Sequence, residues 1–194
     1  RDPKERLEHL VRLELGHAPP EVQRIPPGTV ELFTEVGAAC REVDAVLADG
    51  RLPTMHDLAA LPYTRNVLAE SMRFYPPAYM IGRRSIDAYA VGGYTFAPRT
   101  VFLLPQYLVH RDPRWWPNAE SFEPDRWAVP DESRPRFAYF PFGAGTRVCI
   151  GEQFAWMEGT LALATLARRW RVRVPGPDPQ CDPIITLRPK HGMP

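Results

Sequence analysis

Apolar side chains recur through much of this chain at the three- and four-residue spacing that places them on one face of a helix. This spacing predicts helices over residues 3–15, 30–47 and 63–75, and a short helix between the last two that Thr54 can cap. The apolar run at residues 154–166 has the length and composition of a buried helix. Prolines and glycines separate these segments, since neither residue type continues a helix well.

Alternating apolar and polar positions predict a smaller share of β-structure. Residues 86–91 and 94–104 read as two strands on either side of a Gly92-Gly93 turn. Shorter alternating runs predict strands at residues 171–174 and 184–187. The chain is therefore predicted to be mainly α with small β-sheets, an α+β class.

The composition is that of a globular chain with a core. Of its 194 residues, 44% are hydrophobic and 24% are charged, and the formal net charge is +1. This balance argues against a nucleic-acid protein, which needs a basic face. No apolar run approaches the length of a membrane span, and no signal peptide is visible. The 23 prolines exceed the usual share of about one residue in twenty, so many short elements are expected.

The cysteines do not form a recognisable framework. Cys40, Cys149 and Cys181 are odd in number and show no C-x-x-C spacing, so disulfides or a zinc site are not expected. A reducing, cytoplasmic location is the compartment that fits. Cys40 falls on the apolar face of residues 30–47 and reads as a small core side chain.

Cys149 differs from the other two cysteines in its surroundings. It lies between glycine-rich turns, just before the apolar run at residues 154–166. The N–H groups and dipole at a helix N-terminus favour negative charge, so the thiol is expected to favour its thiolate form. Glycines let the backbone approach a large flat group, and Arg147 offers a fixed fork for a carboxylate. These features converge on a haem held by a cysteine thiolate. The simpler alternative is a buried structural cysteine in a glycine-rich turn.

The segment resembles the cysteine-ligand loop of the cytochrome P-450 family, whose pattern is F-x-x-G-x-R-x-C-x-G. All five fixed positions are present, as Phe142, Gly145, Arg147, Cys149 and Gly151. The resemblance implies that Cys149 is the axial ligand of the iron in a haem b (iron protoporphyrin) and is catalytic in that role. It implies further cofactor contacts from residues on both sides of Cys149: Pro141, Phe142, Gly143, Gly145, Arg147, Ile150, Gly151 and Ala155.

Two helix and loop segments extend the resemblance. The E-x-x-R of residues 63–75, Glu70 and Arg73, looks like part of the family's structural triad, and Arg126 in S-F-E-P-D-R-W looks like its third member. Such a cluster would fix the geometry of the core beneath the cysteine loop. As an ordinary exposed pair, Glu70 and Arg73 would contribute only a few tenths of a kcal/mol.

The segment before Gly92-Gly93 resembles the family's main sheet, in which an arginine reaches a haem propionate. Counting back from the glycine pair favours Arg83, with Arg84 as the alternative. Neighbouring strand residues point to opposite faces, so only one of the two can face the cofactor. The remaining reading is a solvated basic pair.

Other positions are weaker candidates. By resemblance, Ile184, Ile185 and Thr186 form the tip of a hairpin that lines the substrate pocket, or else they are plain core. His110 could hydrogen-bond near a propionate, but it reads more simply as a structural histidine. Arg134 and Arg136 are expected to be exposed, either on a docking surface for an acidic electron donor or on a solvated loop.

The resemblance is close from Glu42 onwards. Residues 42–194 are expected to be the C-terminal haem-binding portion of the domain, and residues 1–41 a helical segment that matches the family poorly. The family's N-terminal helices and its central oxygen-activating helix, with a run like A-G-x-E-T-T, have no counterpart here. Since the chain begins at Arg1 rather than Met, we expect its start to be a cut.

The resemblance implies a haem-thiolate monooxygenase, or its C-terminal part, of the soluble bacterial type. Such an enzyme inserts one oxygen atom from O2 into a small hydrophobic organic substrate. Its electrons come from NAD(P)H through a ferredoxin or flavin-type partner, and the missing N-terminal half would be a further partner. The alternatives are a catalytically incomplete haem-binding remnant and a cofactor-free interaction module.

Overall fold

The structure, a computed structural model, describes residues 34–170 and 180–190 of the chain. The helices are α2 (Thr34–Val46), α3 (Pro62–Phe74), α4 (Gln106–Val109) and α5 (Glu152–Arg169). The 3₁₀ turns are η1 (Met55–Ala60), η2 (Pro124–Trp127), η3 (Arg136–Ala138) and η4 (Gly145–Arg147). The strands are β1 (Ile81–Arg84), β2 (Tyr89–Val91), β3 (Tyr94–Phe96), β4 (Val101–Leu104), β5 (Cys181–Pro183) and β6 (Leu187–Pro189). This mainly α fold with small antiparallel sheets confirms the predicted class. The expected helix at 3–15 and strand at 171–174 lie outside the described residues.

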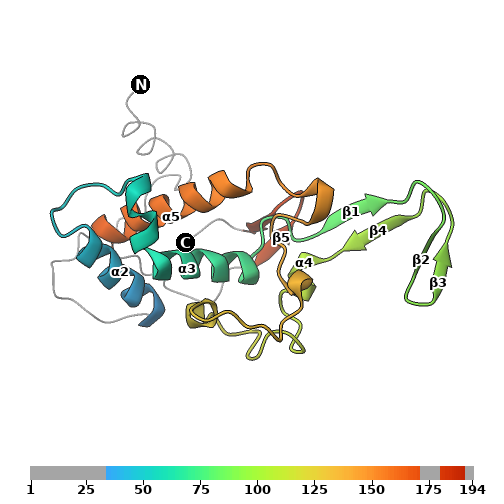
Figure 1. Ribbon diagram of the computed structural model, residues 1–194, viewed down its shortest axis with the longest axis horizontal. Coiled ribbons are helices and arrows are strands. Elements are labelled where there is room, and N and C mark those ends of the chain that lie inside the picture. The colour runs from blue at the N-terminus through green and yellow to red at the C-terminus, as the bar shows by residue number, and fades with distance from the viewer. Residues whose placement is uncertain (1–33, 171–179, 191–194) are drawn as a thin grey trace, which may run out of the picture.

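Helices α2, α3 and α5 pack against one another at one end of the molecule, and α3 and α5 lie side by side (Figure 1). Their shared core consists of fully buried apolar side chains: Val43, Leu47, Leu61 and Ala164. The helices approach closely at Gly159, where an added Cβ would lie 2.7 Å from the Leu68 side chain. None of the helices in the described segments combines the length and the apolar character needed to cross a bilayer.

A carboxylate from α2 caps the N-terminus of α3. The residue at the cap position, Leu61, has no side-chain acceptor for the free N–H groups of the first turn. Glu42 supplies one, because its carboxylate oxygens accept hydrogen bonds from Tyr63 N at 2.7 Å and from Thr64 N at 2.8 Å. The Thr64 hydroxyl donates a third bond at 2.7 Å. The carboxylate also lies at the positive end of the helix dipole, and so stabilises α3.

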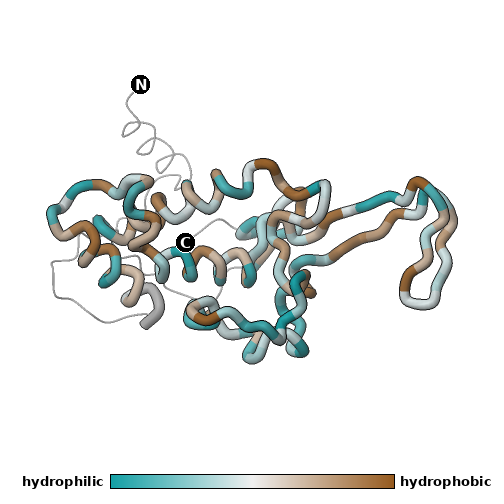
Figure 2. Tube along the Cα trace, in the orientation of Figure 1, coloured by the Kyte–Doolittle hydropathy of each residue, from teal (hydrophilic) through white to brown (hydrophobic). Residues whose placement is uncertain are grey.

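The strands of the middle segment form a long ribbon that projects away from the helices (Figure 1). Strands β1 and β4 pair antiparallel, with Arg83 opposite Phe102, and β2 pairs with β3 across Gly92 and Gly93. Both glycines have positive φ, +59° and +82°, as a tight two-residue hairpin requires. Figure 2 shows apolar positions at the far end of this ribbon and just before α5.

The predicted strand at residues 94–104 is interrupted. The backbone turns at residues 97–100, where Arg99 has a φ of +69° and Thr100 N donates to Ala97 O. Pro98 contributes to the break because it cannot donate to a strand ladder. The predicted strand at residues 86–91 is displaced, since β1 ends at Arg84 and β2 covers Tyr89–Val91. Arg83 and Arg84 are neighbouring strand residues, as expected.

The predicted strand at residues 184–187 is misplaced. Residues 184–186 form the turn between β5 and β6, and Ile184 and Ile185 are 59% and 91% exposed. The Tyr79 hydroxyl donates to Ile184 O at 2.9 Å and holds this hairpin against the segment that follows α3. The three residues at the tip are therefore neither strand nor core.

The long loops before α5 surround a second core, in which Trp116 is fully buried beside Ala119 and Ala138. The Arg134 guanidinium lies 4.1 Å from the centre of the Trp116 ring and pairs with Asp131 at 3.2 Å. Its side chain is only 13% exposed, so the expectation of an exposed Arg134 was wrong. Stacking on a tryptophan desolvates a guanidinium without leaving it unpartnered. Arg136 does lie at the surface.

Candidate functional site

The segment of residues 140–151, which we call the Cys149 loop, is held in shape by its own backbone. Phe140 O accepts a hydrogen bond from Gly143 N at 2.9 Å, and Cys149 N donates to Phe142 O at 2.9 Å. Gly143 has a φ of +77°, in the left-handed region that side chains other than glycine rarely adopt. The loop therefore folds back on itself and brings Cys149 beside Phe142.

The Cys149 thiol is exposed at the point where the loop meets α5. Gly151 is the N-terminal cap of α5, and a Cβ added to it would lie 3.7 Å from the Cys149 sulfur. A larger residue at 151 would therefore cover part of the sulfur. The position next to a helix N-terminus favours a negatively charged ligand atom.

Large apolar residues close to Cys149 in the sequence are exposed. Val148 is 44% exposed, Phe154 is 60% exposed and Ile150 is fully exposed. Exposed apolar side chains that cluster beside a functional group are typical of a site that binds another group. Further along the loop and α5, Ala155 is partly buried and the Phe142 ring lies 5.9 Å from that of Trp156.

Two arginines add positive charge to this region. The Arg83 guanidinium lies beside Gly143, with Nη2 4.0 Å from the position of an added Cβ, and Nη1 donates to Gly82 O at 2.8 Å. Arg147 ends the turn η4 within the Cys149 loop and is exposed. Within residues 34–170 and 180–190, neither side chain forms an ion pair. Both are thus available to a carboxylate from outside the described chain.

Taken together, an exposed thiol, an apolar surround and two uncompensated guanidinium groups fit a large flat group with an apolar face and carboxylate arms. A haem has these properties, and its iron accepts a cysteine thiolate as axial ligand. The structure brings the predicted loop residues and Arg83 to one region. The predicted pocket residues Ile184, Ile185 and Thr186 lie on the separate β5–β6 turn.

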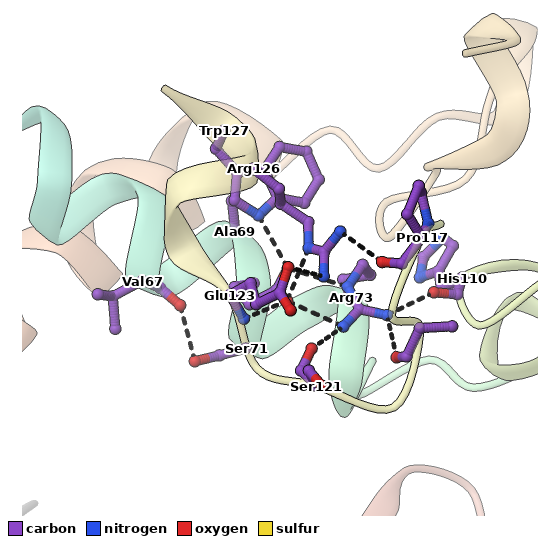
Figure 3. Close-up of polar contacts among 12 residues, drawn as sticks. Val67, Ala69, Ser71, Arg73, His110, Pro117, Ser121, Glu123, Arg126 and Trp127 are labelled. Atoms are coloured by element: carbon purple, nitrogen blue, oxygen red, sulfur yellow. Dashed lines mark hydrogen bonds and ion pairs between the residues drawn. The ribbon is translucent and has the colours of Figure 1, made fainter. Parts of the chain in front are cut away.

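Behind the loop, the Glu70 carboxylate is buried at the centre of a dense polar cluster (Figure 3). Arg73 donates to both carboxylate oxygens, from Nε and Nη2, each at 2.9 Å. Arg126 Nε donates to Oε1 at 3.0 Å. The backbone N–H of Glu123 and the indole of Trp127 complete the set at 2.8 and 2.9 Å. The structure therefore brings Glu70, Arg73 and Arg126 together around one carboxylate.

Arg73 joins α3 to the loops that follow α4. Besides its bonds to Glu70, it donates to the backbone oxygens of His110, Ala119 and Ser121 at 2.8–2.9 Å. All five guanidinium N–H groups thus have partners, which a buried charge requires. Burial would raise the pKa of Glu70, but the hydrogen bonds from Arg73 and the Glu123 amide outweigh it and hold the pKa below its ordinary value.

Two buried side chains near α4 bind the backbone of Phe140, where the Cys149 loop begins. His110 Nε2 accepts a hydrogen bond from Phe140 N at 3.0 Å, and Gln106 Nε2 donates to Phe140 O. His110 is therefore a structural histidine bonded to the loop. Burial lowers its pKa to about 4, and the charges of Arg73 and Arg111 act in the same direction.

This pKa predicts a loss of stability in mild acid. Folded chains keep His110 neutral down to about pH 4, whereas unfolded chains protonate it below its ordinary value of 6.5. The unfolded state binds more protons in that interval, so the free energy of unfolding falls by about 3 kcal/mol as pH is lowered from 6.5 to 4. Urea unfolding at each pH measures the free energy of unfolding. His110→Gln should remove the decrease of this free energy between pH 6.5 and 4, whereas His56→Gln, at an exposed site, should keep it. An unchanged decrease in His110→Gln contradicts the assignment of the pH dependence to His110.

Several functional contacts could not have been read from the sequence. The E-x-x-R spacing indicates that Glu70 and Arg73 can meet on one helix face, but it says nothing of Trp127, the Glu123 amide or the loop carbonyls. For Gln106 and His110 the sequence gives only a weak signal, which is two polar residues four apart in an otherwise apolar run. That spacing places them on one face of a helical turn.

Comparison with known proteins gives one family. A family model described as Cytochrome P450 matches residues 35–193. Cyclooctatin synthase of Streptomyces melanosporofaciens is 43% identical over 149 residues, which cover 75% of this chain and 32% of that protein. Cyclooctat-9-en-7-ol 5-monooxygenase of the same organism is 43% identical over 138 residues, covering 70% and 30%. Putative cytochrome P450 132 of Mycobacterium tuberculosis is 39% identical over 153 residues, covering 78% and 33%. The chain spans about a third of the length of these relatives.

Proposed function

Because this chain belongs to the cytochrome P450 family, we propose that it forms the cysteine-ligand part of a haem-thiolate monooxygenase. Membership of the family implies a haem, which we take to be haem b, and we assign the binding portion to residues 42–194. The observation that carries the proposal is the exposed Cys149 thiol among uncovered apolar side chains, with Arg83 beside the same loop.

Each residue of the site has a distinct task in this proposal. Cys149 supplies the sulfur ligand to the iron, and Arg83 and Arg147 bind the propionates. Val148, Ile150 and Phe154 would supply the apolar surface that holds the haem and would exclude water from the sulfur. When bound, a thiolate-ligated haem supplies the iron centre at which O2 is activated.

The remaining loop residues set the shape of this site. Gly143 and Gly145 give the left-handed turns of the loop, with φ of +77° and +70°. Pro141, Phe142, Gly151 and Ala155 form the backbone and packing around the ligand. The cluster of Glu70, Arg73 and Arg126 acts from behind the loop, and its part in the reaction is structural.

We propose a small hydrophobic organic molecule as substrate and NAD(P)H, through a ferredoxin or flavin-type protein, as the source of electrons. Two relatives are named cyclooctatin synthase and cyclooctat-9-en-7-ol 5-monooxygenase, which supports an organic substrate. Ile184, Ile185 and Thr186 would contact it from the β5–β6 turn. For an acidic donor protein, Arg136 is the candidate contact, because Arg134 is already stacked on Trp116.

A haem-binding remnant without turnover is the second candidate. It is favoured by the uncovered apolar side chains close to Cys149 in the sequence. A partner segment that covers this surface would complete the pocket. Both candidates share the haem, and only the first requires oxidation of a substrate.

Haem uptake by the purified chain tests the proposal directly. The chain is titrated with haem, reduced and exposed to CO, and the position of the absorbance band is recorded. We expect saturable, one-to-one uptake and the band that marks a thiolate ligand. Failure to bind haem, both alone and with an added N-terminal part of a relative, rejects the proposal.

Arg83 and Arg84 provide a matched pair for the propionate contact. Loss of one charge-assisted hydrogen bond costs about 1.5–3 kcal/mol, so Arg83→Ala should weaken haem binding by at least about tenfold. Arg84→Ala, next to it on the same strand and also exposed, should change it by less than about twofold. Equal losses in both variants would indicate general electrostatic attraction rather than a specific contact.

A further inference from the structure

We infer that Gln106 and His110 form a side-chain clamp on Phe140 that holds the Cys149 sulfur at a fixed position relative to its ligand. They are positioning residues, since neither lies in the Cys149 loop itself. The inference rests on the proposed function for its link to haem. The geometry of the clamp depends only on contacts within the chain.

The clamp binds both backbone polar groups of a single residue. Phe140 N–H donates to His110 Nε2 at 3.0 Å, and Phe140 C=O accepts from Gln106 Nε2. Gln106 opens α4 and His110 caps it, and His110 N donates to Gln106 O at 2.8 Å. The two side chains therefore reach Phe140 from one helical turn. Like a paired strand, they offer a donor to its C=O and an acceptor to its N–H.

Burial makes the clamp rigid. Gln106 and His110 are both fully buried, and Phe140 is 9% exposed. Among residues 34–170 and 180–190, Gln106 Oε1 has no hydrogen-bond partner, so within this part of the chain the Phe140 carbonyl orients the amide. The His110 ring also meets the Phe140 ring edge to face, with centroids 5.3 Å apart. Moving Phe140 would leave buried polar groups unpaired, which costs more than the bonds themselves contribute.

Two backbone hydrogen bonds of the loop connect Phe140 and its neighbours to the backbone of Cys149. Phe140 O also accepts from Gly143 N, which closes the first turn of the loop, and Phe142 O accepts from Cys149 N. The sequence between these bonds contains two left-handed glycines, Gly143 and Gly145, whose backbone is otherwise the most adaptable in the loop. A fixed Phe140 removes this freedom and so sets where Cys149 lies.

The clamp is also tied to the buried cluster behind it. Arg73 donates to His110 O at 2.9 Å (Figure 3). Since Arg73 also binds Glu70 and His110 accepts from Phe140 N, these four residues form one continuous set of contacts. A change at Glu70 or Arg73 would reach Cys149 along this route. Through the clamp, a change in the cluster would therefore alter the position of Cys149 and not only the stability of the fold.

Four variants of the full chain test the clamp without haem. Gln106→Leu and His110→Phe each remove one bond to Phe140, and His110→Phe keeps a ring. His110→Gln restores an acceptor at similar reach. Glu42→Gln weakens the cap of α3, away from the loop, and serves as the control for lost stability. The measurements are amide hydrogen exchange at Gly143 and Cys149 and the rate of Cys149 alkylation.

We expect exchange at Gly143 and Cys149 to rise by about tenfold in Gln106→Leu and His110→Phe, the effect of losing one buried hydrogen bond. His110→Gln and Glu42→Gln should stay within about twofold of the unchanged chain. Faster exchange at Phe140 alone, with Gly143, Cys149 and the alkylation rate unaffected, overturns the inference.

The haem-loaded chain gives the second readout. In the two clamp variants we expect at least a twofold smaller fraction of the ferrous-CO complex to show thiolate ligation, with no such change in Glu42→Gln. If the unchanged chain binds no haem, both alone and with an added N-terminal part of a relative, the proposed function fails and hydrogen exchange still decides the clamp. If the unchanged chain binds haem and the clamp variants match it in both readouts, the inference alone fails.

Discussion

Replacing Cys149 by serine should abolish the thiolate band of the ferrous-CO complex. A hydroxyl has neither the charge nor the polarisable sulfur that iron accepts from cysteine, and its oxygen is a poor ligand at neutral pH. Loss of outer-shell contacts alone lowers metal affinity by about 10–100-fold, so loss of the ligand should lower haem affinity by more than about 100-fold. The measurements are haem titration and the reduced CO spectrum.

The matched control for Cys149 lies in the same chain. Cys181→Ser changes a partly buried cysteine on β5 and should leave the thiolate band in place. Cys149→Ser should also leave the free energy of unfolding of the haem-free chain nearly unchanged, because its side chain is exposed. A thiolate band that persists in Cys149→Ser and disappears in Cys181→Ser would show that Cys181, and not Cys149, is the ligand.

Replacing Arg73 by methionine should cost at least about 3–5 kcal/mol of folding stability, the usual result of removing one partner of a buried ion pair. The substitution leaves the Glu70 carboxylate buried with fewer partners. It also frees the carbonyl groups of His110 and Ala119, which are buried, and that of Ser121. Because domains of this size are stable by only about 5–15 kcal/mol, much of the margin would be lost. Urea unfolding of the haem-free chain measures it.

The double variant separates a buried charge from a missing contact. Glu70→Met combined with Arg73→Met removes the unpaired carboxylate, so its cost should be smaller than the sum of the two single costs. Arg84→Met, an exposed arginine, should change stability by less than about 0.5 kcal/mol. Strict additivity, or a loss of under about 1 kcal/mol in Arg73→Met, would show that the cluster is not a buried ion pair in solution.

The family resemblance seen in the sequence is confirmed by the family match, and so is the fold class. Both were accessible because they depend on local features: helical periodicity, capping residues, and five fixed residues around one cysteine. Pro62 opens α3 as expected, and Thr54 caps η1 together with Asp57. Helix boundaries marked by a proline or a capping residue can be predicted because they depend only on the few residues beside them.

The features that the sequence did not predict depend on residues far apart in the chain. Glu42 caps a helix 21 residues later, and Arg134 is buried because Trp116 provides a flat surface for it. The bounds of β1 are set only by its pairing with β4. The roles assigned to Arg83 and the Cys149 loop stay predictions, although the structure gathers these residues in one region.

The bonds of Arg73 also bear on the order in which the chain folds. Its three backbone acceptors lie 37, 46 and 48 residues away in sequence. Closing segments of this length costs conformational entropy, so we expect these contacts to form late in folding. Contacts made after the transition state chiefly slow unfolding. We therefore expect loss of the Arg73 cluster to speed unfolding more than it slows folding.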